Sequence, residues 1–291
     1  MSHRPAGSNS RSHPRQEPEI GVQEILLLAL LGAAVGTYGT LVGVGGGFLV
    51  VPLLLLIYNL SPPAAAATSL VVVCLNALSG SISYLRMRRV DLRTGLILAV
   101  ATIPGALIGP ALAVRVPERA FKIAFALFLL GLAFVLYRRP ERVVGANAPA
   151  GNSRWHIHRT FVDRSGSAIE YHFNVPLALA ISLLVGVLSS MLGIGGGIVH
   201  VPAMIHVMSF PVHIATATSQ FVLAITSAAG VAEYAARGHV VWPIALSIGS
   251  GVVVGAQLGA ALSHRMKGPG IVRLLTIAVV VLAVRLLWSA I

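Results

Sequence analysis

The sequence predicts an all-α polytopic membrane protein with two homologous four-span repeats, each containing a glycine-broken re-entrant half-helix. Three observations support this fold class. Hydrophobic residues make up 56% of the 291 positions and charged residues only 10%, whereas a soluble domain carries about 25% charged residues. Apolar runs of about 20 residues, enough for a helix to cross a bilayer, recur along the chain. The sequence also matches itself at a shift of 150 residues.

Composition and charge exclude several classes of protein. So few charged residues could not cover the surface of a soluble enzyme, a coiled coil or a disordered chain of this length. The net charge of +12 would suit a nucleic-acid-binding protein. The basic residues lie in the gaps between apolar runs, however, which is typical of loop charge that orients a membrane protein. We therefore expect the lipid bilayer, and no nucleic acid, as a partner.

The apolar runs divide the chain into four parts. Residues 1–20 are rich in Arg, Pro and Ser and are expected to form a disordered cytoplasmic tail. The first transmembrane repeat, 21–137, contains spans expected at 23–43, 64–85, 93–114 and 119–137. A polar central loop, 138–174, separates it from the second transmembrane repeat, 175–291, whose spans are expected at 175–193, 213–236, 241–263 and 271–289.

The central loop carries a further local signal. Segments 160–163 and 168–175 flank a turn that contains Gly166, a pattern that predicts a short β-hairpin. Three nearby histidines, His156, His158 and His172, suggest a metal site. Because no further ligand stands at a specific spacing, we predict a solvated hairpin and no metal.

Two apolar segments, 48–58 and 198–209, are too short to span a bilayer as helices. If they re-enter without crossing, each half has four spans and most Lys and Arg residues gather on one side. Both termini would then be cytoplasmic, and an axis along the membrane normal would relate the repeats. If they cross, each half has five spans and the halves are inverted. The charge distribution favours the first arrangement, in a multi-pass protein of the inner cell membrane.

The repeat keeps chemically distinctive residues in one register. The Gly-x-Gly-Gly-Gly cluster at 43–47 aligns with that at 193–197, and each is followed by Val-Pro. Ala-Thr-Ser at 67–69 aligns with the same tripeptide at 217–219. Biased apolar composition does not place glycines, prolines and Thr-Ser pairs in one register, so the chain is a duplication.

The glycine clusters are the main candidates for a binding site. They lack the Lys-Ser/Thr ending of a phosphate-binding P-loop and lie within apolar runs. Glycine permits an unwound backbone, which inside a membrane must be buried in protein or line a cavity. The half-helix after each cluster would then present free N–H groups to an anion. Close helix packing through small residues is the alternative. The candidate substrate-binding glycines are Gly45, Gly46, Gly47, Gly195, Gly196 and Gly197.

The two Thr-Ser pairs are further candidates for substrate binding. Thr68 and Ser69 stand early in one predicted span, and Thr218 and Ser219 stand at the equivalent place in the other half. Their hydroxyl groups could donate to an anionic oxygen. In membrane helices such groups also commonly bond to backbone or to a neighbouring helix, and the sequence leaves both roles open.

Three ionisable residues are candidates for proton coupling. Glu233 lies near the end of its span, where Arg237 at i+4 offers an ordinary ion pair as the alternative. His200 and His206 lie in the second short segment and could titrate near neutral pH or serve in packing. The single cysteine, Cys74, lies in an apolar run and is expected to be a buried structural thiol.

The duplicated Gly-x-Gly-Gly-Gly motif, followed by an apolar run and Val-Pro on each side of a central loop, resembles the sulfite exporter TauE/SafE family. The resemblance covers 24–137 and 175–289. It implies a permease for sulfite, sulfonates or other small organosulfur anions, coupled to a proton or sodium gradient. It also places the six glycines named above in the family's signature. His200 and the long central loop depart from the family pattern.

The sequence therefore predicts a secondary transporter, in the export direction, for a small anionic sulfur-containing substrate. The alternative is a membrane accessory or scaffold subunit without transport of its own. No cofactor and no enzymatic activity are expected, because Cys74, His200, His206 and Glu233 show no recognised catalytic spacing. The sequence does not define the oligomeric state.

Overall fold

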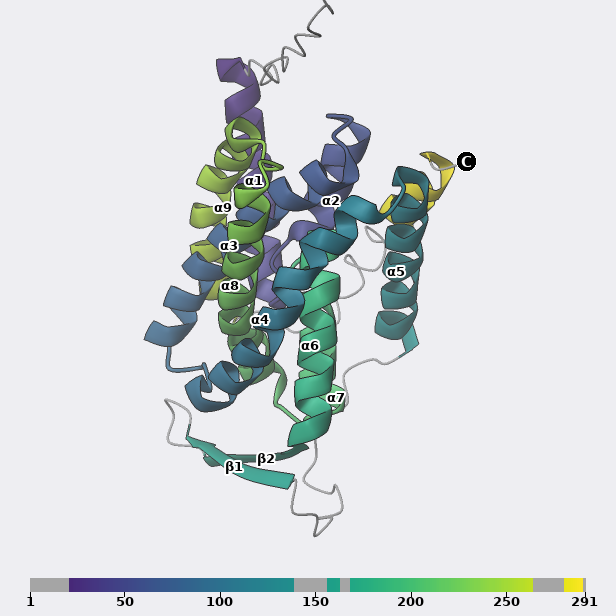
Figure 1. The fold of residues 1–291 in the computed structure, drawn as a ribbon. Coiled ribbons are helices and arrows are strands. Elements are labelled where there is room, and N and C mark those ends of the chain that lie inside the picture. Colours follow the sequence, from purple (N-terminus) through teal and green to yellow (C-terminus); the bar gives the residue numbers. More distant parts are fainter. Residues whose placement is uncertain (1–20, 139–155, 163–167, 264–279, 290–291) are drawn as a thin grey trace, which may run out of the picture.

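The computed structural model describes residues 21–138, 156–162, 168–263 and 280–289. The described residues form a helical bundle with one β-hairpin (Figure 1). The helices of the first half are α1 (Val22–Val42), α2 (Gly47–Leu56), α3 (Pro62–Arg86), α4 (Leu92–Arg115) and α5 (Glu118–Arg138). The hairpin and the second half comprise β1 (His156–Val162), β2 (Ala168–Asn174), α6 (Val175–Leu192), α7 (Gly197–His206), α8 (Val212–Ala236) and α9 (Trp242–Leu262).

Six of these helices, α1, α3, α4, α6, α8 and α9, are long and apolar enough to cross a membrane. Their bounds differ by one or two residues at most from the predicted spans. Local signals set their ends: Asp91 caps α4 by accepting the Thr94 N–H at 3.2 Å, and Asn174 caps α6 through the Leu177 N–H. The predicted tail at 1–20 lies outside the described residues. Of the predicted last span, only Val280–Ser289 is described, and it is helical.

The first long helix of each half packs along one helix of the other half, α1 along α9 and α6 along α4. In α1 against α9, a Cβ built on Gly36 would lie 2.6 Å from the Val252 carbonyl oxygen. The equivalent contact of α6 against α4 places a Cβ on Gly186 2.2 Å from the Thr102 oxygen. Only glycine permits such backbone contact, as is common between membrane helices. The two halves are therefore intertwined.

Equivalent helices of the two halves run in opposite directions. The contacts of Gly32 with Ile248 and Gly36 with Val252 make α1 and α9 parallel. Ser79 donates to the Val253 carbonyl and Ser83 to Gln257, so α3 runs parallel to them. The counterparts α6, α8 and α4 are likewise mutually parallel. A Cβ built on Gly80 of α3 would touch Gln220, and one on Gly230 would touch Leu70, so α3 and α8 are antiparallel.

The halves are thus inverted, and the arrangement favoured from the charge distribution, with an axis along the membrane normal, is wrong. That arrangement was inferred by placing most of the basic loops on one side of the membrane, whereas the structure distributes these loops differently between the two ends of the bundle. Tyr84, near the end of α3, donates to the Thr40 carbonyl near the end of α1. The arginine-rich segment 86–93 therefore lies at the end of the bundle opposite the start of α1 (Figure 1).

Each short helix turns back towards the end of the bundle where its half begins. A Cβ on Gly46 would lie 3.1 Å from the Val35 carbonyl oxygen, so the chain folds back on α1 before α2 starts. Beyond α2, the Tyr58 hydroxyl donates to the Glu24 carboxylate at 2.7 Å, which ties the end of α2 to the start of α1. The start of α1 and helix Val280–Ser289 lie at this same end of the bundle (Figure 1).

The hairpin lies at the opposite end, in the segment where the sequence predicts one. Its strands are antiparallel, with His158 paired to His172 in the backbone register. Tyr171 and Phe173 stack on each other and on Phe210, whose ring centroid is 4.1 Å from that of Tyr171. The Tyr171 hydroxyl also donates to the Asp91 carboxylate. The hairpin therefore binds the α7–α8 connection and the start of α4 together.

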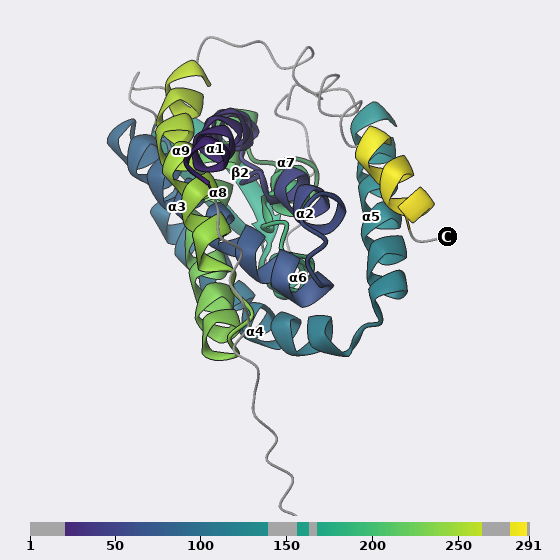
Figure 2. The same cartoon turned by 90° about the horizontal axis from the view of Figure 1, so that it is seen from above.

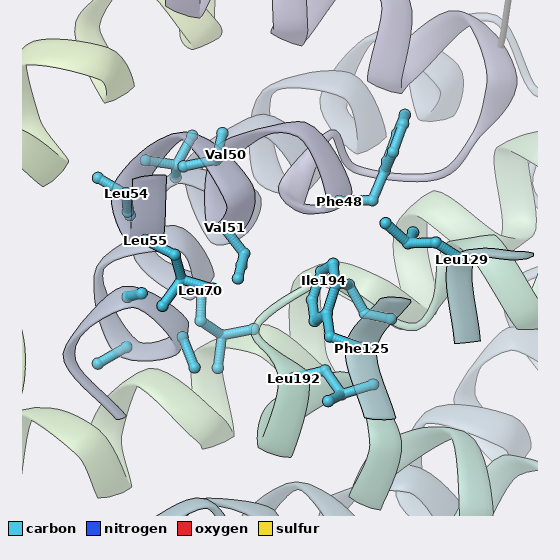
Figure 3. Packing of buried hydrophobic residues seen from close by; sticks show 14 of the residues in the cluster. Phe48, Val50, Val51, Leu54, Leu55, Leu70, Phe125, Leu129, Leu192 and Ile194 are labelled. Atoms are coloured by element: carbon cyan, nitrogen blue, oxygen red, sulfur yellow. The ribbon is translucent and has the colours of Figure 1, made fainter. Parts of the chain in front are cut away.

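Viewed from above, α2 and α7 lie between the α1–α9 pair and α5 (Figure 2). The largest apolar cluster forms around α2, where Phe48 is fully buried. Figure 3 shows Phe48 beside Leu129 of α5, with Phe125 of α5 beside Ile194 of the second glycine cluster. This packing holds the short helix in place and brings the two glycine clusters into the centre of the protein.

Candidate functional site

Both glycine clusters interrupt helices, as the sequence predicts. In the first cluster Gly43, Gly45 and Gly46 have φ of 79°, 85° and 80°, and in the second Gly193 and Gly195 have 68° and 73°. These are left-handed conformations that side chains other than glycine rarely adopt. The first cluster separates α1 from α2, and the second separates α6 from α7.

The two breaks contact each other. A Cβ on Gly47 would lie 2.6 Å from the Gly193 carbonyl oxygen, and one on Gly197 would lie 2.2 Å from the Gly43 oxygen. Residues 43–47 and 193–197 are all buried. The first turns of α2 and α7 therefore meet, backbone to backbone, inside the bundle.

The first turns of both short helices carry backbone donors without partners. In the part of the chain that the structure describes, no hydrogen bond is made by the N–H groups of Gly46, Gly47, Phe48, Gly196, Gly197 and Ile198. Such orphan donors are usual at a helix start, but here they are buried, where an unsatisfied polar group is costly. With the positive end of the helix dipole, each set is suited to binding an anion.

A buried polar chain lies beside the first break. The Gln220 amide nitrogen donates to Thr40 Oγ1 at 3.0 Å, and the Thr40 hydroxyl donates to Asn76 Oδ1 at 2.8 Å. All three side chains are completely buried. None of these three residues is among the candidates predicted from the sequence. The signal that could have found them is an amide in the middle of an apolar span, at Asn76 and Gln220.

The chain is similar to known membrane proteins over most of its length. The profile of the family described as "Sulfite exporter TauE/SafE" matches residues 28–286. The chain belongs to this family. It is 32% identical over 273 residues to the "Probable membrane transporter protein YunE" of Bacillus subtilis, covering 91% of this chain and 98% of that protein. No solved structure matches.

More distant relatives carry similar names. A "Probable membrane transporter protein" of Xylella fastidiosa is 26% identical over 92% of this chain and 97% of its own length. One from Methanocaldococcus jannaschii is 25% identical over 83% of this chain and 87% of its own length. The TauE/SafE match and these relatives, together with the six apolar helices, make the chain a multi-pass membrane transporter.

In this TauE/SafE protein the Thr-Ser pairs bind backbone of the opposite half. Ser69 Oγ donates to the Gly193 carbonyl at 2.7 Å, and Ser219 Oγ approaches the Gly43 carbonyl at 3.4 Å. Each threonine hydroxyl accepts a backbone N–H from the other half, just before a helix begins. Thr68 accepts from Val241 before α9, and Thr218 accepts from Asp91 before α4, both at 3.1 Å. These four residues hold the breaks together. Their role in substrate binding stays a prediction.

The three candidates for proton coupling lie in different surroundings. Glu233 forms an ion pair with Arg237, whose Nε lies 2.7 Å from the carboxylate, at the end of α8. His200 is buried one turn after the second break, and its Nε2 lies 3.1 Å from Ser182 Oγ. His206 closes the last turn of α7. The structure thus brings only His200 near the glycine breaks.

Proposed function

We propose that this TauE/SafE protein is a secondary transporter that exports small sulfur-containing anions such as sulfite or organosulfonates. The observation that carries the proposal is the contact between two buried helix starts with unpaired N–H groups. The family description supports sulfite as the chemical class. The anion would be bound by the amides of both breaks, without any resident cofactor.

Inverted halves support a transport mechanism for this site. In transporters built from inverted repeats, broken helices meet at the bilayer midplane, and one part of the protein rocks against the other around the bound substrate. Here the two breaks belong to opposite halves. A movement of one half would therefore expose the anion first to one end of the bundle and then to the other. We infer coupling to a proton or sodium gradient, with His200 as the histidine closest to the site.

The test is transport of radiolabelled sulfite by the purified protein in proteoliposomes. Wild-type protein should release sulfite down an imposed gradient, and Gly46→Leu and Gly196→Leu should abolish release. Gly131→Leu is the matched control, because a Cβ on Gly131 would have nothing within 4 Å. Unimpaired transport by both variants of the breaks would refute the binding mode, and no sulfite transport by wild type would refute the substrate class.

The membrane orientation is proposed separately. We propose an inner-membrane location with both termini cytoplasmic, and the structure supports only that the two described ends of the chain share one end of the bundle (Figure 1). Reporter proteins fused after Ile291 and within the central loop should report opposite sides. Reporters on the same side would contradict the inverted arrangement.

A further inference from the structure

Four buried side-chain donors have no hydrogen-bond partner within the described ranges: Asn76 Nδ2, Ser81 Oγ, Arg89 Nη1 and Ser189 Oγ. Two of them, Asn76 Nδ2 and Ser189 Oγ, lie beside the glycine breaks. Asn76 is fully buried and Ser189 is 1% exposed. Buried polar atoms are almost always paired, and each unpaired one costs free energy unless water or a ligand satisfies it. Both atoms therefore point to a missing acceptor.

Each donor lies close to the first turn of one short helix. A Cβ built on Gly39 would lie 2.6 Å from the Gly46 amide nitrogen and 3.0 Å from Asn76 Nδ2, so these two donors face the same small region. A Cβ built on Gly196 would lie 3.6 Å from Ser189 Oγ. Each set of unpaired backbone amides thus has one unpaired side-chain donor beside it.

These two donors come from positions that are not equivalent in the repeat. The counterpart of Asn76 is Thr226, whose hydroxyl donates to the Val222 carbonyl at 2.9 Å and lies 2.5 Å from Thr102 Oγ1. The counterpart of Ser189 is Gly39, which has no side chain and leaves its space to the Asn76 amide. One donor comes from α3 and the other from α6. If both donors had been retained from the duplicated unit, they would lie at equivalent positions on equivalent helices of the two halves.

The orientation of the Asn76 amide follows from its neighbours. Gln220 donates to Thr40, and Thr40 in turn donates to Asn76 Oδ1. In this arrangement Thr40 engages the oxygen of the Asn76 amide and the amide nitrogen faces the first break, while Gln220 Oε1 also has no partner within the described residues. Gln220 and Thr40 are therefore positioning residues for Asn76.

We propose that Asn76 Nδ2 and Ser189 Oγ are the two side-chain donors that bind the oxygens of a small oxyanion, each beside the free amides of one break. This rests on the proposed function and extends it to residues outside the glycine motif. The recognised group is an acceptor-only oxyanion such as sulfite or the sulfonate end of an organosulfonate. The site is asymmetric, because its two faces present chemically different donors, an amide and a hydroxyl, to the same anion.

The test measures anion binding by the full-length protein in lipid nanodiscs, by calorimetry and by thermal shift. Sulfite is the first probe, followed by sulfate, thiosulfate, sulfoacetate, phosphate and nitrate. Asn76→Asp keeps an acceptor for Thr40 but removes the donor, and Asn76→Thr introduces the residue of the equivalent position. Each should weaken binding roughly 10- to 100-fold, and Ser189→Ala roughly 10-fold, as expected for a hydrogen bond to an anion.

Matched controls separate binding from folding. Thr226→Val changes the counterpart of Asn76, and Ser227→Ala removes a buried hydroxyl that already donates to the Leu223 carbonyl at 2.6 Å. Both should bind sulfite as wild type does. Thr40→Val and Gln220→Leu should each weaken sulfite binding. The double variant should bind no more weakly than either single variant, since both residues act through Asn76.

The outcomes distinguish this inference from the proposed function. If wild type binds sulfite and the Asn76 and Ser189 variants bind it equally well, the inference is wrong and the function stands. If wild type binds only phosphate or nitrate, and the same variants lose that binding, the sulfur substrate is wrong and the inference stands. Absence of binding for every anion overturns both.

Discussion

The two glycine breaks have the same sequence pattern but differ in backbone and in side-chain chemistry. Their mutual contacts are equivalent, since Gly47 meets the Gly193 carbonyl as Gly197 meets that of Gly43. Yet Gly46 is left-handed at φ 80°, whereas Gly196 is in the right-handed region at φ −62°. The side-chain donors also come from different helices. Duplication thus accounts for the shared frame of the breaks, and residues that differ at equivalent positions make the two faces different.

The largest expected effect tests the shared frame. Gly47→Ala and Gly197→Ala should both prevent folding or lower the melting temperature in detergent strongly, because each Cβ would press on a backbone carbonyl that cannot move aside. Overpacking of this kind costs about 1–3 kcal/mol and occasionally more. Gly131→Ala should behave as wild type. If one of the two break variants were tolerated, the breaks would not be equivalent in their contacts.

The next effect separates backbone from packing. Gly46→Ala and Gly196→Ala each meet the Cγ1 atom of a valine, Val35 at 2.6 Å and Val185 at 2.4 Å, and Gly46→Ala also meets the Val35 carbonyl oxygen at 3.1 Å. Of the two glycines, only Gly46 has a left-handed backbone, and this conformation destabilises a residue that has a side chain by about 1–2 kcal/mol. Gly46→Ala should therefore be the less stable by about this amount in thermal unfolding.

A second pair of variants isolates that difference. Val185→Ala should restore Gly196→Ala almost completely, because the only obstacle there is a side chain. Val35→Ala should restore Gly46→Ala only in part, since the left-handed backbone strain and the contact with the Val35 carbonyl oxygen both remain. Equal rescue in the two halves would contradict the difference in φ between Gly46 and Gly196.

The sequence predicted the helices and the breaks well because both depend on local pattern. Apolar runs placed the ends of α3 and α4 within two residues, and the glycine clusters marked where α1 and α6 end. The direction of the second half was wrong, because it was inferred from loop charge. Charge grouping says which loops face one side only if the number of passes is already known.

The side-chain donors were not predicted, for a different reason. Neither Asn76 nor Ser189 is among the candidates predicted from the sequence, since each gains its role from a segment that is distant in sequence. Asn76 lies beside the Gly46 amide only because α2 folds back on α1. Ser69 shows the converse case: its position suggested substrate binding, and the fold gives it a backbone carbonyl of the opposite half.

The smallest expected effect decides between those two roles of the Thr-Ser pairs. Ser69→Ala removes a 2.7 Å hydrogen bond to the Gly193 carbonyl, whereas Ser219→Ala removes one of 3.4 Å to Gly43. A buried hydrogen bond contributes about 0.5–1.5 kcal/mol, so Ser69→Ala should lower the melting temperature measurably and Ser219→Ala less. If the serines join the breaks, sulfite affinity should change little in either variant. An unchanged melting temperature with a large loss of sulfite affinity would instead make Ser69 a ligand of the anion, and its bond to Gly193 would then be a resting contact that the substrate replaces.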